Sequence, residues 1–310
     1  MQQITITSVN ISVQKGTIKK PAEQIELTHQ GVRFDAHAGN WNRQVSLLGT
    51  ESIEKFELDA KRKVTPGEFA ENITTAGMEL WLTHPLDRFT CGDIELEVTQ
   101  IGKECHGSSC AIFKEVGNCV MPKEGIFCRV LSPGILKEGM ELEYHPKIYR
   151  VMVITLSDRA SAGEYEDKSG PRIIEHLTSH FACCNFDFAV DPYLIPDDPH
   201  KLEALLHKAK EELFDMVITT GGTGIGPRDF TPDVVKSQLD KEIPGIMEMI
   251  RMKYGADKPA ALLSRSIAGV MGKSLVFALP GSVKAVNEYL AEIMKSLTHM
   301  VYMLHGLDGH

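Results

Sequence analysis

The sequence has no long hydrophobic run and no surplus of basic residues. No window approaches the roughly 18 consecutive apolar residues that a membrane-spanning helix needs. The start, MQQITITSVNISVQKG, has no apolar segment behind a basic one, as a secretory signal would have. The formal net charge of −9 over 310 residues, without a basic tail or stripe, argues against nucleic acid as a partner. We therefore expect a cytoplasmic protein with no membrane partner, long enough for two domains.

Cysteine occurs in an odd number, and no two cysteines have the C-x-x-C spacing. Seven cysteines in a chain of this size, without a sign of export, do not indicate a disulfide framework. Structural zinc stays an alternative, because clustered cysteines and His106 supply enough ligands, but the missing C-x-x-C pair argues against it. The clustered cysteines are Cys91, Cys105, Cys110, Cys119 and Cys128.

The two halves of the chain follow different hydrophobic patterns. Up to about Tyr144 there are short β-like runs, such as ITITSVNISV, IELEVTQI and IFCRVL, separated by glycine, proline and polar turns. One helical stretch, roughly 47–56, interrupts them. Closely spaced short strands predict a small β-barrel or sandwich. The pattern changes near Pro146, and we expect one domain over residues 1–147 and another over 148–310.

In the second half, strands and helices alternate. The apolar runs RVMVITL, FDFAV, FDMVITT and KSLVFALP are typical of buried strands, and a helical segment follows each of them. Pro171, Asp198 and Thr231 occur where three of these helices begin, Asp198 and Thr231 at cap positions. The last helix continues its apolar spacing over 283–304. The chain is therefore predicted to be α/β, with an N-terminal β-barrel and a doubly wound domain built on a mostly parallel sheet.

A glycine-rich loop follows one of the predicted strands. The stretch VITTGGTGIGPRDFTPDVV places four glycines in six residues between a strand and a helix. Glycines let the backbone approach an anion, and the helix N-terminus faces the same place. The loop is no Walker loop, because no Lys-Ser or Lys-Thr follows, and no dinucleotide fingerprint, because Pro227 stands in the third glycine position. A phosphate or carboxylate site is predicted, and a tight turn without ligand is the alternative.

Charged residues lie directly beside this loop. Asp229 and Asp233 would repel an anionic guest unless a cation lies between them, and Mg²⁺ is the usual mediator. For Asp233, a favourable interaction with the helix dipole is an equal explanation. Arg228 either neutralises a phosphate oxygen or pairs with Asp229.

Three further loops follow strands of the same predicted sheet. Because the carboxyl ends of parallel strands meet at one edge of a sheet, we expect these loops beside the glycine loop. A single aspartate in such a loop is more often a turn or cap residue, so the argument depends on four loops together. The loops SDRASAGEYEDKSG, IPDDPH and LPGS contain Asp158, Arg159, Asp167, Ser169, Gly170, Asp197, Asp198, Gly281 and Ser282.

These stretches resemble the molybdopterin adenylyltransferase family of the MogA and gephyrin G-domain type. The resemblance is carried by SDRASAGEYEDKSGPR, TTGGTGIGPRDFTPD, EIPGIMEMIR and LLSRSIAGVMGKSLVFALPGS, in this order over most of 150–305. It implies transfer of adenylate from ATP to the terminal phosphate of molybdopterin, with Mg²⁺ as the cation and pyrophosphate as a product. It also implies a homotrimer formed through the C-terminal domain, and a downstream molybdenum insertion protein as a partner.

The resemblance also implies roles for individual residues. Asp167 and Asp197 are implied as catalytic residues that handle the metal and the phosphates, and Asp229 as a catalytic residue at the glycine backbone. The residues implied in binding ATP and molybdopterin are Ser157, Asp158, Arg159, Ser169, Gly170, Gly221, Gly222, Thr223, Gly224, Arg228, Thr231, Ser264, Arg265, Pro280, Gly281 and Ser282.

Within these binding residues, the resemblance implies two groups that contact different parts of the substrates. Ser264 and Arg265 belong to the pterin pocket, and residues 280–282 border the adenosine. The last motif of the family usually reads P-G-[SN]-P-K, and Val283 replaces its second proline here. The adenosine assignment is the weaker one for that reason.

The first half resembles a MOSC domain, the β-barrel module related to the C-termini of molybdenum cofactor sulfurases. The resemblance covers about 30–145 and is carried by FDAHAGNWNRQVSLLGTESIEKF, PGEFAENITTAGMEL and the stretch from QIGKECHGSSC to GMELEY. It implies that this half binds the metal-pterin cofactor or carries sulfur on a reactive cysteine. Partial exposure near positive charge activates such a cysteine. Cys105, between Lys103 and His106, is therefore the catalytic candidate, and Cys110 and Cys119 follow.

Four other residues of this half have an expected role in packing or in anion binding. Cys128 alternates with apolar neighbours and is expected to be a packed strand residue. His37 and Arg43 are candidates for an anion pocket, and Asn72 for a hydrogen bond to the anion. For each of these polar residues, a structural role in a turn or interface is the competing explanation.

Three functions are compatible with these patterns. The first is an enzyme of molybdenum cofactor biosynthesis whose two modules cooperate. The second is a non-catalytic protein that binds and delivers the cofactor, which predicts stoichiometric pterin binding without ATP-dependent pyrophosphate release. The third is a nucleotide-binding module beside an unrelated barrel, which predicts ATP binding indifferent to pterin. The joint presence of Asp167, Asp229 and TTGGTG favours the first.

Overall fold

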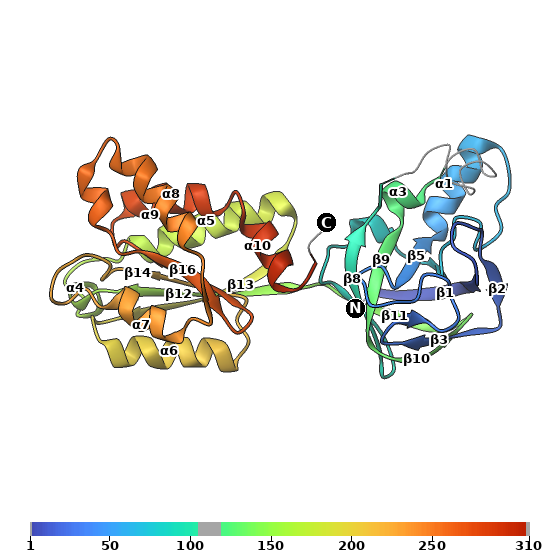
Figure 1. The fold of residues 1–310 in the computed structure, drawn as a ribbon, viewed down its shortest axis with the longest axis horizontal. Helices are drawn as coiled ribbons and strands as arrows, with labels where there is room; N and C mark the ends of the chain where they lie inside the picture. Colours follow the sequence, from blue (N-terminus) through green and yellow to red (C-terminus); the bar gives the residue numbers. More distant parts are fainter. Residues whose placement is uncertain (1, 105–118, 308–310) are drawn as a thin grey trace. The chain divides into compact units, whose positions relative to one another are not determined.

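The structure, a computed structural model, describes residues 2–104 and 119–307 (Figure 1). Contacts within the chain divide it into unit 1, Met1–Lys147, and unit 2, Ile148–His310. Each unit has a hydrophobic core of its own. In the described ranges, no helix is long and apolar enough to cross a membrane.

Unit 1 consists mainly of short strands. Its strands are β1 (Gln2–Ile11), β2 (Lys20–Ala22), β3 (Gln24–Thr28), β4 (Gly31–Val32), β5 (Val45–Gly49), β6 (Ile73–Ala76), β7 (Arg88–Cys91), β8 (Ile94–Ile101), β9 (Ile126–Ser132), β10 (Gly134–Lys137) and β11 (Glu141–His145). Its helices are α1 (Thr50–Ala60), η1 (Leu80–Leu82) and α3 (Met121–Glu124). The strands pair in the order β11-β7-β8-β9-β5-β6-β1, and β1 pairs with β11, so the sheet closes into a barrel. Strands β5 and β6 run parallel, while their other neighbours run antiparallel.

The barrel follows from the alternation of apolar and polar residues in its strands. In β1, Ile4 and Ile6 are buried while Gln3 and Thr5 are exposed. The helix expected over 47–56 begins at Thr50 instead. Leu47 and Leu48 are completely buried strand residues paired with β6, so the start of the expected helix was wrong.

Unit 2 alternates strands and helices. Its strands are β12 (Ile148–Leu156), β13 (Asp187–Ile195), β14 (Met216–Thr220), β15 (Lys241–Glu242), β16 (Ile267–Met271) and β17 (Ser274–Leu279). Its helices are α4 (Asp158–Ser161), α5 (Ser169–Cys184), α6 (Pro199–Glu211), α7 (Thr231–Gln238), α8 (Pro244–Gly255), η3 (Pro259–Leu263), α9 (Val283–Ile293) and α10 (Leu297–Leu304). The sheet order is β13-β12-β14-β17-β16-β15, with the first four strands parallel and the last two antiparallel to their neighbours.

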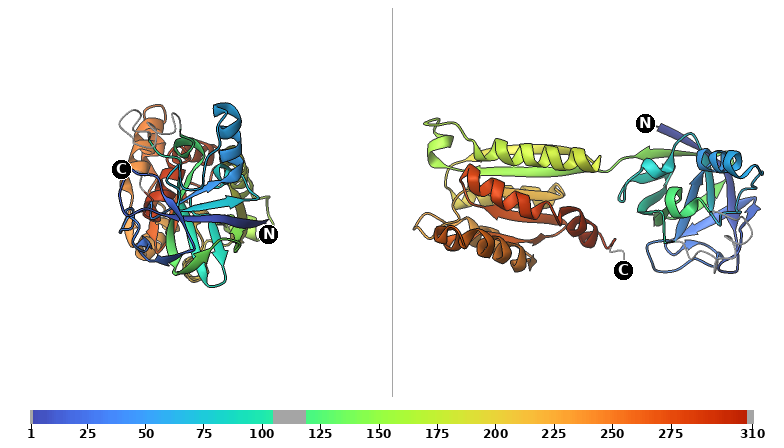
Figure 2. Two further views of the ribbon diagram at one scale, coloured as in Figure 1. Left: turned by 90° about the vertical axis from the view of Figure 1, so that its right-hand side faces the viewer. Right: turned by 90° about the horizontal axis from the view of Figure 1, so that it is seen from above.

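Helices cover both faces of the unit 2 sheet. In Figure 1, α5, α8 and α9 lie on one face, and α6 and α7 lie on the other. Figure 2 shows α5 and α9 running side by side. The fold class predicted from the sequence, a β-barrel followed by a mostly parallel, doubly wound α/β domain, is confirmed. Two details were wrong: the last helix divides into α9 and α10, and β15 and β16 were not predicted.

A buried carboxylic acid, Glu71, distinguishes the core of unit 1. Its side chain is completely buried, and Oε1 accepts hydrogen bonds from the Gly67 N–H at 2.5 Å and the Thr74 hydroxyl at 3.1 Å. Burial raises the pKa of Glu71 to about 7, because the charged form loses its hydration. The folded unit therefore holds a proton that the unfolded chain releases.

We expect the free energy of unfolding of unit 1 to fall between about pH 4.5 and pH 7, by at most about 3 kcal/mol. The sign follows because the folded state binds the additional proton throughout this range. Glu71→Gln keeps an oxygen acceptor, cannot ionise and should lose this decline. Urea unfolding followed by tryptophan fluorescence measures it, since both tryptophans, Trp41 and Trp81, are in unit 1. The exposed Glu26→Gln is the control; an unchanged decline in Glu71→Gln would contradict the assignment.

Candidate functional site

The carboxyl ends of the four parallel strands meet at one edge of the unit 2 sheet. The Ser157 N–H, after β12, donates to the carbonyl of Ile195, at the end of β13, at 3.0 Å. The Thr220 hydroxyl, at the end of β14, donates to the carbonyl of Pro280, after β17, at 3.0 Å. The loops that carry the predicted site residues are therefore neighbours.

The glycine loop after β14 passes so close to its neighbours that side chains do not fit. Gly221 and Gly222 have positive φ angles of 111° and 62°. A Cβ at Gly221 would lie 2.4 Å from the carbonyl oxygen of Leu156. A Cβ at Gly281 would lie 3.2 Å from the Cα of Gly221. Loops from three strands thus meet through bare backbone, the arrangement that lets peptide N–H groups face an anion.

Asp158 and Asp197, from the loops after β12 and β13, bind each other's backbone. The Asp197 N–H donates to Oδ1 of Asp158 at 2.9 Å, and the Asp158 N–H donates to Oδ2 of Asp197 at 3.2 Å. Arg228, from the glycine loop, lies 3.3 Å from Oδ2 of Asp158, and its side chain is 82% exposed. Arg228 therefore pairs with Asp158 and not with Asp229. Two carboxylates and an exposed guanidinium from three loops share one surface.

Asp167 is engaged by hydrogen bonds at the start of α5. Its carboxylate accepts from the Thr155 hydroxyl at 2.7 Å, from the Ser169 N–H and hydroxyl at 2.9 Å each, and from the Gly170 N–H at 3.2 Å. A Cβ at Gly170 would lie 2.5 Å from Oδ2 of Asp167, so this contact needs glycine. Asp167 thereby joins β12 to the first turn of α5. Thr155 was not predicted from the sequence, because a threonine inside an apolar strand gives no signal of its own.

Arg265 fixes the glycine loop from the side of β16. Its Nε donates to the carbonyl of Gly224 at 2.8 Å, and its Nη2 donates to the carbonyl of Asp229. Its Nη1 contacts both carboxylate oxygens of Asp233, at 2.9 and 3.0 Å. Its own N–H donates to the carbonyl of Thr223 at 2.8 Å. The side chain of Arg265 thus holds two carbonyls of the loop and the start of α7, and its backbone holds a third carbonyl.

Asp229 and Thr231 turn toward the interior of the glycine loop. Oδ2 of Asp229 accepts the Gly226 N–H at 2.8 Å. Thr231 was expected to cap α7, and this was wrong: α7 begins at Thr231 itself, after Phe230, and no side chain caps it. Thr231 is completely buried and its hydroxyl has no hydrogen-bond partner among the described residues. A Cβ at Gly222 would lie 2.5 Å from this hydroxyl, so the threonine packs against bare backbone.

A pocket of ≈ 290 Å³ opens beside Arg265. Ser264 and Arg265, implied in the pterin pocket, belong to its lining, together with Asp233 and Arg251. The Ser264 hydroxyl lies 2.8 Å from that of Ser266, which also lines the pocket. The pocket therefore has a polar wall next to the glycine loop.

The remaining predicted residues shape the starts of helices. Ser157 and Ser282 cap α4 and α9, each by accepting a backbone N–H with its hydroxyl. Asp198 caps α6 by accepting the N–H groups of His200 and Lys201 with its carboxylate, which confirms the expected cap. The guanidinium of Arg159 lies over the ring of Tyr165, 5.2 Å from its centroid. These residues order the loops around the edge of the sheet.

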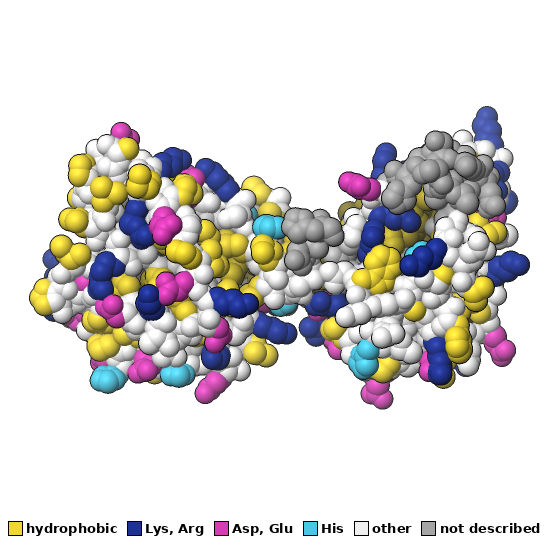
Figure 3. All heavy atoms as spheres, in the orientation of Figure 1, with side chains coloured by type: hydrophobic (Ala, Val, Ile, Leu, Met, Phe, Trp, Pro, Cys, Tyr) yellow, Lys and Arg dark blue, Asp and Glu magenta, His cyan; other side chains and the backbone are white. Residues whose placement is uncertain are grey.

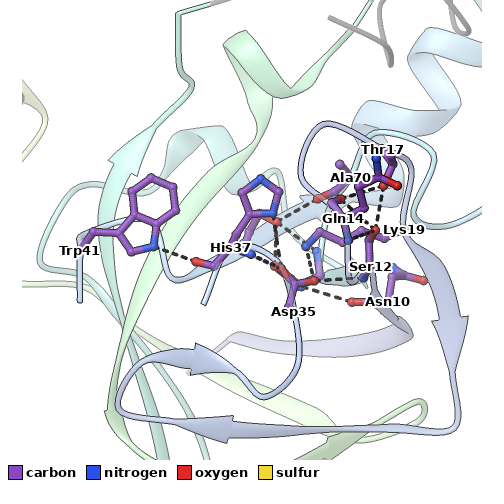
Figure 4. Close-up of polar contacts among 11 residues, drawn as sticks. Asn10, Ser12, Gln14, Thr17, Lys19, Asp35, His37, Trp41 and Ala70 are labelled. Atoms are coloured by element: carbon purple, nitrogen blue, oxygen red, sulfur yellow. Dashed lines mark hydrogen bonds and ion pairs between the residues drawn. The ribbon is translucent and has the colours of Figure 1, made fainter. Parts of the chain in front are cut away.

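Unit 1 contains a pocket of ≈ 320 Å³ that gathers residues far apart in the sequence. His37, Arg43 and Asn72, the candidates for an anion pocket, all line it. Asp35 lies behind His37, with its side chain completely buried (Figure 4). Asp35 was not predicted from the sequence, although its place two residues before a histidine, in FDAHAG, is a signal that could have found it.

The cysteines of unit 1 differ in position. Cys105, its neighbour His106 and Cys110 lie outside the described residues, so the catalytic role of Cys105 stays a prediction. Cys119 is partly exposed. Cys128 is completely buried in β9, as expected for a packed residue, and burial raises the pKa of its thiol. In the described part of the chain, no three His, Cys, Asp or Glu side chains are grouped to hold a metal ion.

Comparison with known proteins identifies relatives of both units. The family model MoCF_biosynth, "Probable molybdopterin binding domain", matches residues 152–299, and the model of the MOSC domain matches residues 35–143. A molybdopterin adenylyltransferase of Helicobacter pylori J99 is 37% identical over 155 residues, which cover 50% of this chain and 86% of that protein.

Two further relatives cover similar parts of the chain. A molybdenum cofactor biosynthesis bifunctional protein of Chlorobaculum tepidum is 35% identical over 170 residues, 54% of this chain and 51% of that protein. The solved structure of the molybdopterin biosynthesis enzyme MoaB of Thermus thermophilus is 37% identical and covers 51% of this chain and 98% of that chain, with a TM-score of 0.47. The chain therefore belongs to the MoCF_biosynth family through unit 2 and carries a MOSC domain in unit 1, as the resemblance of its motifs predicted.

Proposed function

We propose that the chain acts in molybdenum cofactor biosynthesis and that unit 2, residues 148–310, adenylylates molybdopterin. The relatives named molybdopterin adenylyltransferase support this reaction, because they align with nearly all of unit 2. The observation that carries the proposal is the meeting of Gly221, Asp158, Asp197 and Arg228 at one edge of the sheet. ATP and molybdopterin are the proposed substrates.

The proposed reaction brings two anions together. An oxygen of the molybdopterin phosphate attacks the α-phosphorus of ATP, a new P–O bond forms, and the bond to the β-phosphate breaks with its electron pair leaving on pyrophosphate. Catalysis of such a step is mainly positioning and charge neutralisation. At the sheet edge, the peptide N–H groups of the glycine loop and the exposed guanidinium of Arg228 would position the phosphates and neutralise their charge.

Magnesium fits this edge through Asp197 and Asp158, better than through Asp167. A protein-bound Mg²⁺ usually keeps only one or two carboxylates and takes its other ligands from water and substrate phosphates. In the described chain, Asp197 accepts a hydrogen bond on Oδ2 alone, whereas four donors engage Asp167. When bound, the ion would neutralise charge between the phosphates. Asp167 then serves as a positioning residue for the start of α5.

Unit 1 is proposed to bind the cofactor or to carry sulfur to it. The MOSC match and the pocket lined by His37 and Arg43 support cofactor binding. Linking both modules in one chain favours hand-over of an unstable intermediate. A homotrimer formed through unit 2 and delivery to a molybdenum insertion protein complete the proposal.

The direct test is pyrophosphate release by the purified chain. With ATP, Mg²⁺ and molybdopterin together we expect repeated turnover, and omission of any one should abolish it. Stoichiometric molybdopterin binding without pyrophosphate would instead identify a binding and delivery protein. ATP binding that is indifferent to molybdopterin would refute both functions.

Asp197→Asn separates the metal role from helix capping. We expect the rate of pyrophosphate release to fall by a factor on the order of 100, because one charged ligand is lost at the phosphates. The matched control is Asp198→Asn, the neighbouring carboxylate that caps α6, since asparagine caps about as well as aspartate. Thermal unfolding should be the same in both variants. Wild-type turnover in Asp197→Asn would remove Asp197 from the site.

Arg265→Lys tests the fixation of the glycine loop. A lysine cannot hold Gly224, Asp229 and Asp233 together, because it lacks the planar fork of donors. We expect faster amide hydrogen exchange in 221–230 and molybdopterin binding weaker by about tenfold. Arg251→Lys is the control, because Arg251 lines the same pocket and, among the described residues, donates only to the carbonyl of Ser266, at 3.0 Å. Equal exchange in both variants would show that Arg265 does not order the loop.

A further inference from the structure

The pocket of unit 1 has a cationic lining without a carboxylate. Lys15, Arg43 and Lys103 all line it, and no Asp or Glu is among the described residues that form its lining. None of these three cations forms an ion pair with a carboxylate in residues 2–104 and 119–307. Figure 3 shows Lys and Arg side chains beside exposed hydrophobic surface on this unit, with a histidine among them. Such a lining attracts an anion.

Aromatic rings hold two of the cationic groups in place. The guanidinium of Arg43 lies 4.9 Å from the ring centroid of Trp41, and the ammonium of Lys103 lies 5.8 Å from that of Phe127. Trp41 also stacks on His37, with ring centroids 6.4 Å apart and planes 12° apart. The indole N–H of Trp41 donates to the carbonyl of His37 at 2.8 Å. Trp41 therefore contacts both the histidine and the arginine of the pocket.

Asp35 lies behind His37, close to both its backbone N–H and its ring. Its Oδ1 accepts the His37 N–H at 2.9 Å and lies 3.4 Å from Nδ1 of the same residue. Its Oδ2 is held by Lys19 at 2.5 Å and by the Asn72 amide and the Ser12 N–H at 3.1 Å each. In Figure 4, Nδ1 of the His37 ring faces Asp35 and the other ring nitrogen points away from it. With Nδ1 turned to a carboxylate, Nε2 is the nitrogen left for a ligand.

The charge behind His37 is fixed. Burial favours the neutral form of Asp35, but the His37 side chain and the charge of Lys19 outweigh it and hold the pKa of Asp35 well below its ordinary value. Burial lowers the pKa of Lys19, which Asp35 partly offsets. Glu71 also acts on Lys19, and it is the group behind the pocket that titrates near pH 7.

We propose that this pocket binds a tetrahedral oxyanion, as in a phosphate ester, and that His37 takes up a proton when the anion binds. A neutral imidazole with its hydrogen on Nδ1 presents a lone pair at Nε2, which repels an anion. Protonation turns Nε2 into a donor, and Asp35 stabilises the imidazolium. Lys15, Arg43 and Lys103 supply the remaining positive charge. This inference deepens the binding role proposed for unit 1 and does not require the transfer reaction of unit 2.

The test uses sulfate as the probe, because its charge does not change between pH 6 and pH 8.5. Trp81→Phe in the full chain leaves Trp41 as the single tryptophan, so fluorescence reports on this pocket alone. At constant ionic strength, sulfate should change the emission saturably. Its affinity should fall about tenfold per pH unit above the range in which histidine titrates, as uptake of one proton requires. A Trp81→Phe protein that shows no saturable change, or a change independent of pH, would overturn the proposal.

Matched variants in the Trp81→Phe background identify the titrating group. His37→Gln should bind sulfate weakly, with an affinity constant within about twofold across the same pH range. Arg43→Gln should bind more weakly than the parent but keep the tenfold dependence, because its positive charge does not titrate. Glu71→Gln should also keep it. A dependence that survives in His37→Gln, or disappears in Glu71→Gln, would refute His37 as the group.

Pyrophosphate release is measured separately on the wild-type chain. Because both tryptophans belong to unit 1, a failed transfer assay leaves the sulfate result interpretable. Likewise, absence of sulfate binding would contradict the oxyanion pocket without touching the adenylylation proposed for unit 2.

Discussion

The close approach of backbone to backbone at the edge of the unit 2 sheet is the constraint on which the proposed site depends. A side chain at Gly221 would collide with the carbonyl of Leu156 and separate the loops after β12 and β14. Arg228 would then lose its contact with Asp158 across these loops, and Arg265 would lose the carbonyls it holds. Glycines that carry no charge therefore decide where the charged groups lie.

The aspartates at this edge form two groups, which differ in the hydrogen bonds that their carboxylate oxygens already accept. Asp167, Asp198 and Asp229 accept backbone N–H groups of their own loops and helices, so their charge offsets local dipoles. Asp158 and Asp197 bind each other's N–H groups across two loops and keep further oxygen capacity for a ligand. An aspartate that caps a helix and one that binds a cation can have the same neighbours in sequence, so only the fold distinguishes them.

The sequence predicted the elements that depend on local pattern. Long apolar runs gave the parallel strands, and the alternation of buried and exposed residues at the start of β1 is typical of a barrel strand. β16 was missed because the run IAGVM is short and contains Gly269, which is needed where a Cβ would lie 2.5 Å from the carbonyl of Lys241. Contacts between distant residues gave no such pattern: Thr155 reaches Asp167, and Lys19 reaches Asp35, only after folding.

The two units present different means of attracting an anion. Unit 2 offers peptide N–H groups at a glycine loop, and these groups do not titrate. Unit 1 offers side-chain cations around a histidine, with the buried Lys19–Asp35 pair behind it. Burying that pair costs desolvation energy, which is tolerable because four groups besides the His37 ring lie close enough to bond the Asp35 carboxylate. The pair keeps a negative charge 3.4 Å from Nδ1 of His37. The attraction proposed for unit 1 therefore depends on protonation of His37, whereas the attraction proposed for unit 2 does not depend on protons.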